Sequence, residues 1–363
     1  MEDPQPLRRG WTTGACATAA AKAAAVALRT DGFPDPVEIT LPGGRRAAFA
    51  LAESRRDARS ATAGVVKDAG DDPDVTHGAL IRATVRAAPA GAGVLFRAGP
   101  GVGTVTRPGL PLPPGEPAIN PVPRAMIRTA LAEAGLPDAE VTISVPDGEK
   151  RAERTLNGRL GIVGGLSILG TTGIVVPYSC AAWIAGIRQG IEVARAAGIA
   201  HLAGATGSGS EAAVRALHGL PEIALIDMGD FVGGMLKHLR AHPVPRVTIA
   251  GGVAKMTKLA QGLLDLHSRR GEVSLSALAG MARQAGADAA LCDAIVHANT
   301  AKHAFDLADG IALGDVVAAR AWQTAAAVLE GAPTDLEIVL FDRDGTLVGR
   351  APFAPVHGRN RLR

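Results

Sequence analysis

The 363-residue chain has very few aromatic residues: Phe, Trp and Tyr together make up 3% of it. Proteins that bind single-stranded nucleic acids use aromatic side chains as platforms on which the bases stack. The formal net charge is only +3, whereas nucleic-acid-binding domains carry a clear excess of Lys and Arg on one face. Both features argue against a nucleic-acid partner, while the mildly basic balance allows an acidic small-molecule substrate.

Cysteine is scarce as well. Cys16, Cys180 and Cys292 are odd in number, lie far apart and form no C-x-x-C pair. Disulfide frameworks and structural zinc sites are usually read from paired, closely spaced cysteines. We therefore expect neither of them, no protein-bound metal, and a cytoplasmic location.

A long, unbroken hydrophobic span is also lacking. Residues 160–187 carry no charge, but they include six glycines and Pro177, and a backbone broken in this way is poorly satisfied in lipid. Arg8-Arg9 before the alanine-rich residues 15–28 faintly resembles a twin-arginine signal. Polar residues interrupt that pattern, so we interpret it as a capped, partly buried helix and expect no membrane partner.

The first half of the chain contains a mixture of short strand and helix patterns. Strand patterns occur at residues 37–41, 47–51, 80–87, 93–98 and 141–145, and helix patterns at residues 15–29 and 125–134. Seven prolines in residues 108–123 argue against a helix or a central strand. That segment is expected to be an ordered loop.

The second half alternates regularly between strands and helices. Strand patterns occur at residues 173–176, 199–203, 222–226 and 246–250, and helix patterns at residues 181–197, 210–217, 231–240 and 253–266. Repeated strand–helix units predict a parallel sheet with helices on both faces. The expected fold is an α+β N-terminal domain, residues 1–155, followed by an α/β domain with a mostly parallel sheet, residues 156–363.

A glycine-rich segment directly follows the strand at residues 199–203. Its glycines allow a ligand to approach the backbone, and the helix that follows offers free N–H groups. Asp227 ends the next strand, where a carboxylate can accept hydrogen bonds from ribose hydroxyls. We expect S-adenosylmethionine or a nicotinamide dinucleotide here, although tight turns of an α/β sheet would give the same pattern. The candidate cofactor-binding residues are Gly204, Thr206, Gly207, Gly209, Glu211 and Asp227.

Two similar triplets, residues 12–14 and 171–173, each consist of two threonines and a glycine and precede a predicted helix. The N–H groups of the first helix could bind a substrate carboxylate, and simple capping is the alternative. The second triplet ends a glycine-rich stretch that also holds Ser167. Glycines in a strand mark the close approach of a ligand or of another backbone, so packing between domains is the alternative there.

Three further patterns are weaker. Residues 67–78 form an acidic cluster that also contains His77. Such a cluster could hold a hard cation, but the segment lacks the calcium-loop pattern. A solvated turn is therefore favoured. His238 and His242 are spaced as in zinc-binding helices, but the glutamate of the HExxH motif is missing. Residues 341–348 match the nucleophile motif of the haloacid dehalogenase phosphatases. That motif opens its fold, and here too few residues follow it, so a C-terminal strand and turn is expected.

Several blocks of the sequence resemble the signature blocks of the cobalt-precorrin-5B C1-methyltransferase family. These blocks are residues 9–22 (RGWTTGACATAAAK), 67–78 (KDAGDDPDVTHG), 101–109 (GVGTVTRPG) with 117–120 (PAIN), and 159–174 (RLGIVGGLSILGTTGI). The resemblance runs in order from about residue 8 to residue 350 and so covers nearly the whole chain.

This resemblance implies methyl transfer from S-adenosylmethionine to C1 of the corrin precursor cobalt-precorrin-5B or precorrin-5B. The products would be the corresponding precorrin-6A and S-adenosylhomocysteine, in cobalamin biosynthesis. We expect the donor in the second domain and the many-carboxylate tetrapyrrole between the domains, bound in part by Arg and Lys. The candidate substrate-binding residues are Thr12, Thr13, Gly14, Arg107, Asn120, Arg124, Arg128, Arg159, Ser167, Thr171, Thr172, Lys255 and Lys258.

The catalytic candidates are His77 and Asp227, either of which could serve as a general base. Two other functions fit parts of the pattern. A nicotinamide-dependent oxidoreductase fits the strand–helix units, although the loop lacks a clean GxGxxG, and a non-catalytic tetrapyrrole-binding protein fits the substrate-facing blocks. The sequence leaves open whether the substrate carries cobalt and whether the protein is a homodimer.

Overall fold

The computed structural model describes residues 6–356, without the side chain of residue 269. The chain divides into two compact units, unit 1 ending at Ser179 and unit 2 beginning at Cys180. We expected the division after residue 155. It lies later because residues between 162 and 175 form three short strands that pair with strands of unit 1.

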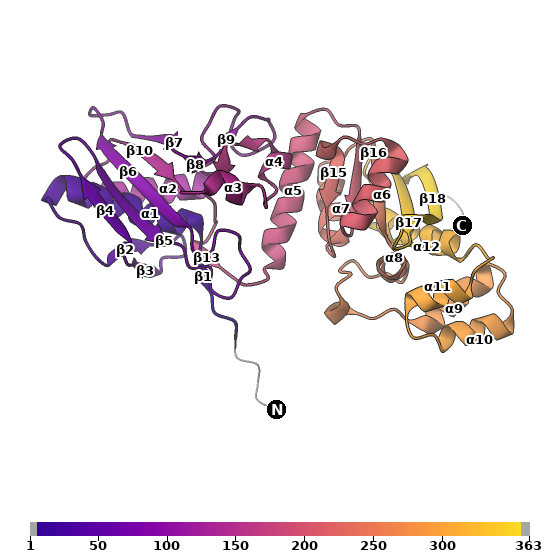
Figure 1. Cartoon of the computed structure of the whole chain (residues 1–363). Helices are drawn as coiled ribbons and strands as arrows, with labels where there is room; N and C mark the ends of the chain where they lie inside the picture. The colour runs from indigo at the N-terminus through magenta and orange to yellow at the C-terminus, as the bar shows by residue number, and fades with distance from the viewer. Residues whose placement is uncertain (1–5, 357–363) are drawn as a thin grey trace. The chain divides into compact units, whose positions relative to one another are not determined.

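Unit 1 contains mostly short strands and one long helix (Figure 1). Its strands are β1 (Gly10–Trp11), β2 (Val37–Thr40), β3 (Arg46–Phe49), β4 (Glu53–Arg56), β5 (Ala61–Val66), β6 (Leu80–Ala87), β7 (Val94–Ala98), β8 (Gly101–Val102), β9 (Thr104–Val105), β10 (Ala139–Ser144), β11 (Ile162–Val163), β12 (Gly165–Leu166) and β13 (Ile174–Val175). Its helices are α1 (Thr13–Thr30), α2 (Pro121–Glu133), α3 (Gly148–Ala152) and α4 (Asn157–Leu160).

The main sheet of unit 1 has the order β4-β5-β6-β10-β7. Its pairs are antiparallel except for β10 and β7, which are parallel. The short pairs β8–β12, β9–β11 and β1–β13 join the segment before residue 106 to the segment after residue 160. These pairings explain why the glycine-rich residues 161–173 belong to unit 1.

Helix α1 lies in the core of unit 1 and packs against β5, β6 and α2. Ten of its residues are alanines or Cys16 with no exposed surface, because small side chains allow strands and a helix to approach it closely on several sides. Its one lysine, Lys22, reaches Glu133 of α2 at 2.6 Å. The sequence predicted this helix as partly buried, and packing makes it almost fully buried. Helix α2 starts at Pro121, earlier than predicted, because proline is tolerated in the first turn.

Unit 2 is an α/β unit (Figure 1). Its strands are β14 (His201–Ala205), β15 (Leu225–Asp227), β16 (Arg246–Gly252), β17 (Asp335–Phe341) and β18 (Leu347–Pro355). Its helices are α5 (Cys180–Ala196), α6 (Ser208–His218), α7 (Val232–Ala241), α8 (Val253–Ala260), α9 (Leu275–Gln284), α10 (Ala289–Val296), α11 (Ala301–Leu307) and α12 (Leu313–Val328), with short 3₁₀ helices η1 (Glu222–Ala224) and η2 (Ser268–Arg270).

The sheet of unit 2 has the order β15-β14-β16-β17-β18. The first four strands are parallel and β18 is antiparallel, so the expected mostly parallel sheet is present. Because β15 and β16 lie on opposite sides of β14, right-handed connections put α6 and α7 on opposite faces of the sheet. Helices α5 and α12 pack against α7.

Several segments of unit 2 were not predicted. Helices α9–α11 form a small group beside α8 and α12 (Figure 1), and no helix was assigned to them from the sequence.

Residues 341–348 form the turn from β17 to β18, with Asp342 accepting backbone hydrogen bonds at 2.8 and 2.9 Å, as expected. Among the described residues, no helix combines the length and the apolar character needed to cross a bilayer.

Candidate functional site

The carboxyl ends of β14, β15 and β16 meet at one edge of the unit 2 sheet. The chain runs from β14 to β15 on one side of β14, and then from β15 to β16 on the other side. The direction of the connections therefore reverses at β14, which makes this point a topological switch. Open parallel sheets bind their ligands outside the strand ends at such a point. The predicted cofactor residues lie near this edge: Gly204 and Asp227 at the ends of β14 and β15, Thr206 and Gly207 in the loop after β14, and Gly209 and Glu211 in the first turn of α6.

Thr206 and Lys255 tie two of these loops together. The Thr206 backbone N–H donates to the carbonyl of Ala250 at 3.0 Å, and the Lys255 ammonium donates to the carbonyl of Thr206 at 2.7 Å. The same ammonium lies 3.2 Å from Oδ1 of Asp230, a buried oxygen that has no aligned hydrogen-bond donor. The Lys255 ammonium and the Asp230 carboxylate therefore lie together at the strand ends.

The glycines of residues 204–209 have different roles. A Cβ on Gly204 would lie 2.4 Å from the sulfur of Met235, so this glycine admits a core methionine of α7 and not a ligand. Gly207 and Gly209 have open space where a side chain would point. Gly207 is the N-cap residue of α6 and no side chain caps that helix. The predicted close approach is thus compatible with Gly207 and Gly209 and is wrong for Gly204.

Asp227 is the last residue of β15 and pairs with Ala205 of β14. The indole N–H of Trp183, on α5, donates to the backbone carbonyl of Asp227 at 3.3 Å. The Trp183 side chain is 49% exposed, and a Cβ on Gly229 would touch its ring at 3.3 Å. A half-exposed indole therefore lies beside the backbone at the end of β15. The sequence analysis missed Trp183, because α5 precedes the sheet and only packing brings it there.

The remaining unit 2 candidates are Glu211 and Lys258. Glu211 lies in the first turn of α6. Lys258 is only 9% exposed, and its ammonium donates to the carbonyl of Leu266 at 3.0 Å, where it holds the loop after α8. We correct its expected substrate role to a structural one, since this buried amine already serves the chain's own backbone.

In unit 1, the start of α1 is closed by the chain itself. Thr12 accepts a hydrogen bond from the N–H of Ala15 at 3.1 Å, and the N–H of Gly14 donates to the carbonyl of Leu169 at 2.9 Å. Thr13 accepts from the Leu169 N–H at 2.9 Å. The predicted binding of a substrate carboxylate by this helix start is therefore wrong, and the capping interpretation is correct.

The second glycine-rich block is partly buried. The Ser167 hydroxyl donates to the side-chain carbonyl of Asn157 at 3.1 Å, and the Asn157 amide donates to the carbonyl of Gly165 at 2.9 Å. Ser167 thus orders this loop and is not available to a substrate. Thr171 and Thr172 are exposed and remain candidates.

The arginine candidates of unit 1 divide into two groups. Arg124 uses all its nitrogens on the chain: it donates to Ile119 and Pro117 carbonyls at 2.7 and 3.0 Å and pairs with Glu116 at 2.8 Å. We therefore remove Arg124 from the substrate site. The other candidates are placed differently: the Arg107 guanidinium donates to the carbonyl of Arg159, Arg128 lies over the Phe96 ring, and the Asn120 side chain makes no cap bond. Arg159 lies in α4 and stays a candidate.

His77 borders a polar cavity of about 490 Å³ in unit 1, lined also by Arg151 and Arg154. Its Nδ1 accepts from the backbone N–H of Ala69 at 3.1 Å, and its side chain is 53% exposed. The imidazole is oriented by this bond and accessible to solvent. Asp71, Asp72 and Asp74 line the same cavity, so it presents both positive and negative groups.

The acidic residues around this cavity are engaged by the protein. Lys67 is 1% exposed and pairs with Asp74 at 2.7 Å. Burial raises the pKa of Asp74, but the Lys67 charge and hydrogen bonds from Lys67 and Thr76 outweigh burial and lower it. Asp68 pairs with Arg8, whose hydrogen bond is the main cause that lowers the pKa of Asp68 to about 2. The sequence analysis favoured a solvated turn here. The segment is a turn, but part of it is buried, since Lys67 lies in the protein interior.

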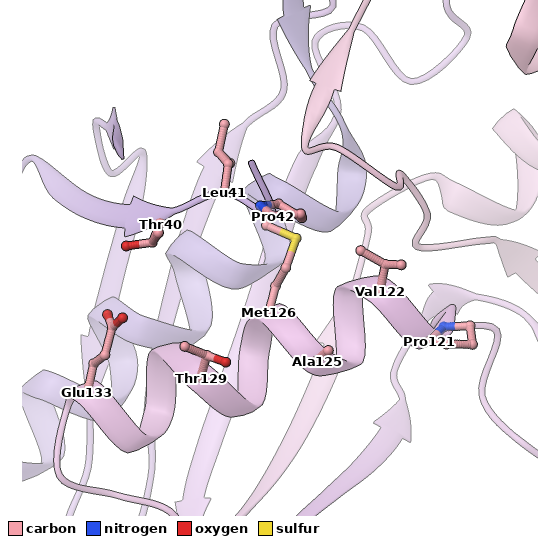
Figure 2. Close-up of a pocket in the computed structure, with 9 residues that line it drawn as sticks. All are labelled: Thr40, Leu41, Pro42, Pro121, Val122, Ala125, Met126, Thr129 and Glu133. Carbon is pink, nitrogen blue, oxygen red and sulfur yellow. The ribbon is translucent and has the colours of Figure 1, made fainter. Parts of the chain in front are cut away.

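A second cavity, of about 400 Å³, lies between the end of β2 and helix α2. Figure 2 shows Met126 and Val122 of α2 facing Leu41 and Pro42, with Glu133 and Thr40 at one end. None of the predicted site residues lines it. It is an apolar groove of unit 1, separate from the histidine-lined cavity.

Comparisons with known proteins agree with the sequence blocks. A sequence model described as CbiD matches residues 1–177, and one described as CbiD, C-terminal domain, matches residues 265–352. A cobalt-precorrin-5B C(1)-methyltransferase from Agrobacterium fabrum is 63% identical over 98% of this chain and 96% of its own length. Proteins of the same name from a Bradyrhizobium species and Paramagnetospirillum magneticum are 64% and 60% identical, covering 95% and 97% of this chain and 94% and 100% of their own lengths.

Among solved structures, a cobalamin biosynthesis protein (cbiD) from Archaeoglobus fulgidus is 28% identical, covers 73% of this chain and 83% of its own, and superposes with a TM-score of 0.39. The relation to the methyltransferases rests on the high identity over almost the full length of both chains. The chain belongs to the CbiD family of cobalt-precorrin-5B C(1)-methyltransferases.

Proposed function

We propose that this chain transfers a methyl group from S-adenosylmethionine to C1 of cobalt-precorrin-5B, in cobalamin biosynthesis. The observation that carries the proposal is the 63% identity over 98% of the chain with a protein of that name. All eight relatives compared, at 57–64% identity, have the same name. None supports a nicotinamide-dependent oxidoreductase or a non-catalytic tetrapyrrole-binding protein.

The donor fits the strand ends of unit 2. Asp227 offers a carboxylate to ribose hydroxyls, and the exposed Trp183 indole beside it offers a face to the adenine ring. The open backbone at Gly207 and Gly209 and the uncapped start of α6 suit the carboxylate of the methionine part. Lys255 adds a positive charge at the same rim.

The sulfonium of the bound donor supplies the electrophilic methyl group, and the protein's task is to hold the donor and the electron-rich ring carbon in line. Alignment of two bound reactants can lower a barrier by roughly 7–11 kcal/mol. In this proposal Asp227 positions the donor. His77, the other catalytic candidate, is exposed, but its Nδ1 accepts from the Ala69 N–H, so the neutral ring carries its proton on Nε2 and can act as a base only if that bond breaks.

A methyl-transfer assay tests the function. The purified full chain would be incubated with cobalt-precorrin-5B and S-adenosylmethionine carrying a labelled methyl group. Label in the tetrapyrrole and release of S-adenosylhomocysteine are expected. Retention of NADH without any methyl transfer, or tetrapyrrole binding without turnover, would contradict the proposal and favour one of the two alternatives.

Asp227→Ala should weaken the binding of S-adenosylhomocysteine about tenfold or more, because hydrogen bonds to a charged group contribute about 1.5–3 kcal/mol. Trp183→Ala should also weaken it, through loss of the stacking face. Isothermal titration calorimetry measures both. The matched control is Asp293→Ala, which removes an exposed carboxylate of α10 and should leave the affinity unchanged. Full affinity in both site variants would mean that the donor binds elsewhere.

A further inference from the structure

Two histidines and a glutamate of unit 2 meet away from the strand ends. His238 lies in the last turn of α7, His242 is its C-cap residue, and Glu192 comes from α5. Oε1 of Glu192 lies 2.8 Å from Nε2 of His238 and 3.1 Å from Nδ1 of His242. The two imidazole rings are stacked, with centroids 4.3 Å apart and an angle of 12° between their planes. The two ring nitrogens therefore both lie close to the same carboxylate oxygen.

These three atoms have the chemistry and spacing of a zinc site. Zinc binds imidazole nitrogen and carboxylate oxygen at about 2.0–2.2 Å in a tetrahedral arrangement, which separates neighbouring ligand atoms by about 3.3 Å. The ligand atoms of this cluster all lie within 4.8 Å of one another. The two contacts of Oε1, at 2.8 and 3.1 Å, each lie within about half an ångström of that separation.

Arg195 also contacts His242. One of its guanidinium nitrogens lies 3.3 Å from Nδ1 of His242 and 2.8 Å from Oε2 of Glu192. Nδ1 of His242 can accept this hydrogen bond only while it carries no proton, which is also the state in which it can bind a metal. A metal at Nδ1 would take the place of this hydrogen bond.

Two surrounding features support a cation at this place. Arg195 holds the other oxygen of Glu192, Oε2, at 2.8 Å, which leaves Oε1 to act as a single ligand, as partners of metal-bound carboxylates do. The cluster also lies at the carboxyl end of α7, where the helix dipole favours positive charge. Arg188 and Arg195 are the nearby positive groups that oppose it.

We propose that Glu192, His238 and His242 form a zinc site that joins the ends of α5 and α7, with water as the fourth ligand. Helix α7 begins after β15 and ends just before β16. The site therefore lies at the edge of the sheet opposite the strand ends assigned to the methyl donor. This proposal does not depend on the proposed function.

The test uses the full chain freed of metal by a chelator. Zinc chloride would be titrated by calorimetry, with cobalt chloride as a second probe because tetrahedral Co²⁺ absorbs visible light. One equivalent of zinc should bind, the Tm should rise, and the Co²⁺ complex should show the intense bands of four-coordination. No binding below about 1 mM zinc, or octahedral Co²⁺ spectra alone, would overturn the proposal.

Variants locate the site. His238→Ala and Glu192→Gln should each weaken zinc binding by more than tenfold and abolish the rise in Tm. His242→Ala provides the same test at a more exposed position, 44% exposed, where folding is least at risk. His297→Ala is the matched control, an exposed histidine beside Asp293, and should bind zinc as the parent does. Unchanged zinc binding in folded His242→Ala and Glu192→Gln would overturn the assignment.

Discussion

At the scale of single residues, a buried network in unit 2 sets the protonation of a histidine. Glu337 has no exposed surface and accepts hydrogen bonds from His218 at 2.6 Å and from Thr248 at 2.8 Å, and Arg350 pairs with its other oxygen at 2.7 Å. The Thr248 hydroxyl has one proton, which it gives to Glu337, so it must accept from Nε2 of His201, 2.8 Å away. His201 therefore carries a proton on Nε2, from which it donates to Thr248.

This network predicts how stability depends on pH. Burial, with a smaller effect of the neighbouring His218, lowers the pKa of His201 from 6.5 to about 4. The unfolded chain then binds a proton that the folded chain excludes, so the free energy of unfolding should fall as the pH falls from 6.5 to about 4. Chemical denaturation across this range should show the loss, and His201→Gln should flatten it.

The exposed His297→Gln serves as the control for that measurement and should leave the slope as it is in the parent. If His201→Gln and His297→Gln gave the same pH dependence as the parent chain, His201 would not be the group that titrates.

At the scale of elements, helix α1 shows how a motif predicted to bind a ligand can instead serve packing. Gly14 lies where α1, α2 and the loop at residue 169 meet, and a Cβ there would lie 2.7 Å from Cγ of Pro123 and 3.0 Å from the carbonyl of Leu169. The glycine is needed for this approach, since the backbone carbonyl cannot move aside as a flexible side chain could. The sequence suggested a substrate contact at the same residue.

Gly14→Ala should therefore lower stability without a direct effect on a ligand. Overpacking costs about 1–3 kcal/mol, of which the better helix propensity of alanine returns up to about 1 kcal/mol. Urea denaturation should show a lower midpoint. Gly32→Ala, just beyond the end of α1 and in open space, is the control and should be near neutral. Equal midpoints in the two variants would contradict the packing role of Gly14.

At the scale of the whole molecule, each unit has its own hydrophobic core. The buried cluster of unit 1 draws on residues from Ala15 to Ile168, and that of unit 2 on residues from Ile187 to Ala351. The two clusters share no residue. Segments with separate cores commonly fold as separate domains.

We expect residues 1–179 and 180–363 to fold when produced separately, each with a single cooperative thermal transition by circular dichroism. The second fragment should bind S-adenosylhomocysteine with an affinity similar to that of the full chain, since all proposed donor contacts lie within it. A folded second fragment that fails to bind would show that unit 1 contributes to the donor site. Absence of a cooperative transition in either fragment would contradict independent folding.

The sequence by itself predicted the family blocks, the strand–helix alternation of unit 2 and the buried helix at the N-terminus. Each depends on local patterns: glycine placement, the period of apolar residues and capping threonines. Only the tertiary structure decided which of the candidate site residues already serve the packing and hydrogen bonding of the chain itself. Leu169 closes the start of α1, Met235 occupies the space beside Gly204, and Leu266 engages Lys258. Glu192 joins a histidine pair almost fifty residues later because α5 packs on α7. Such contacts depend on how distant segments pack, and spacing along the chain does not encode that directly.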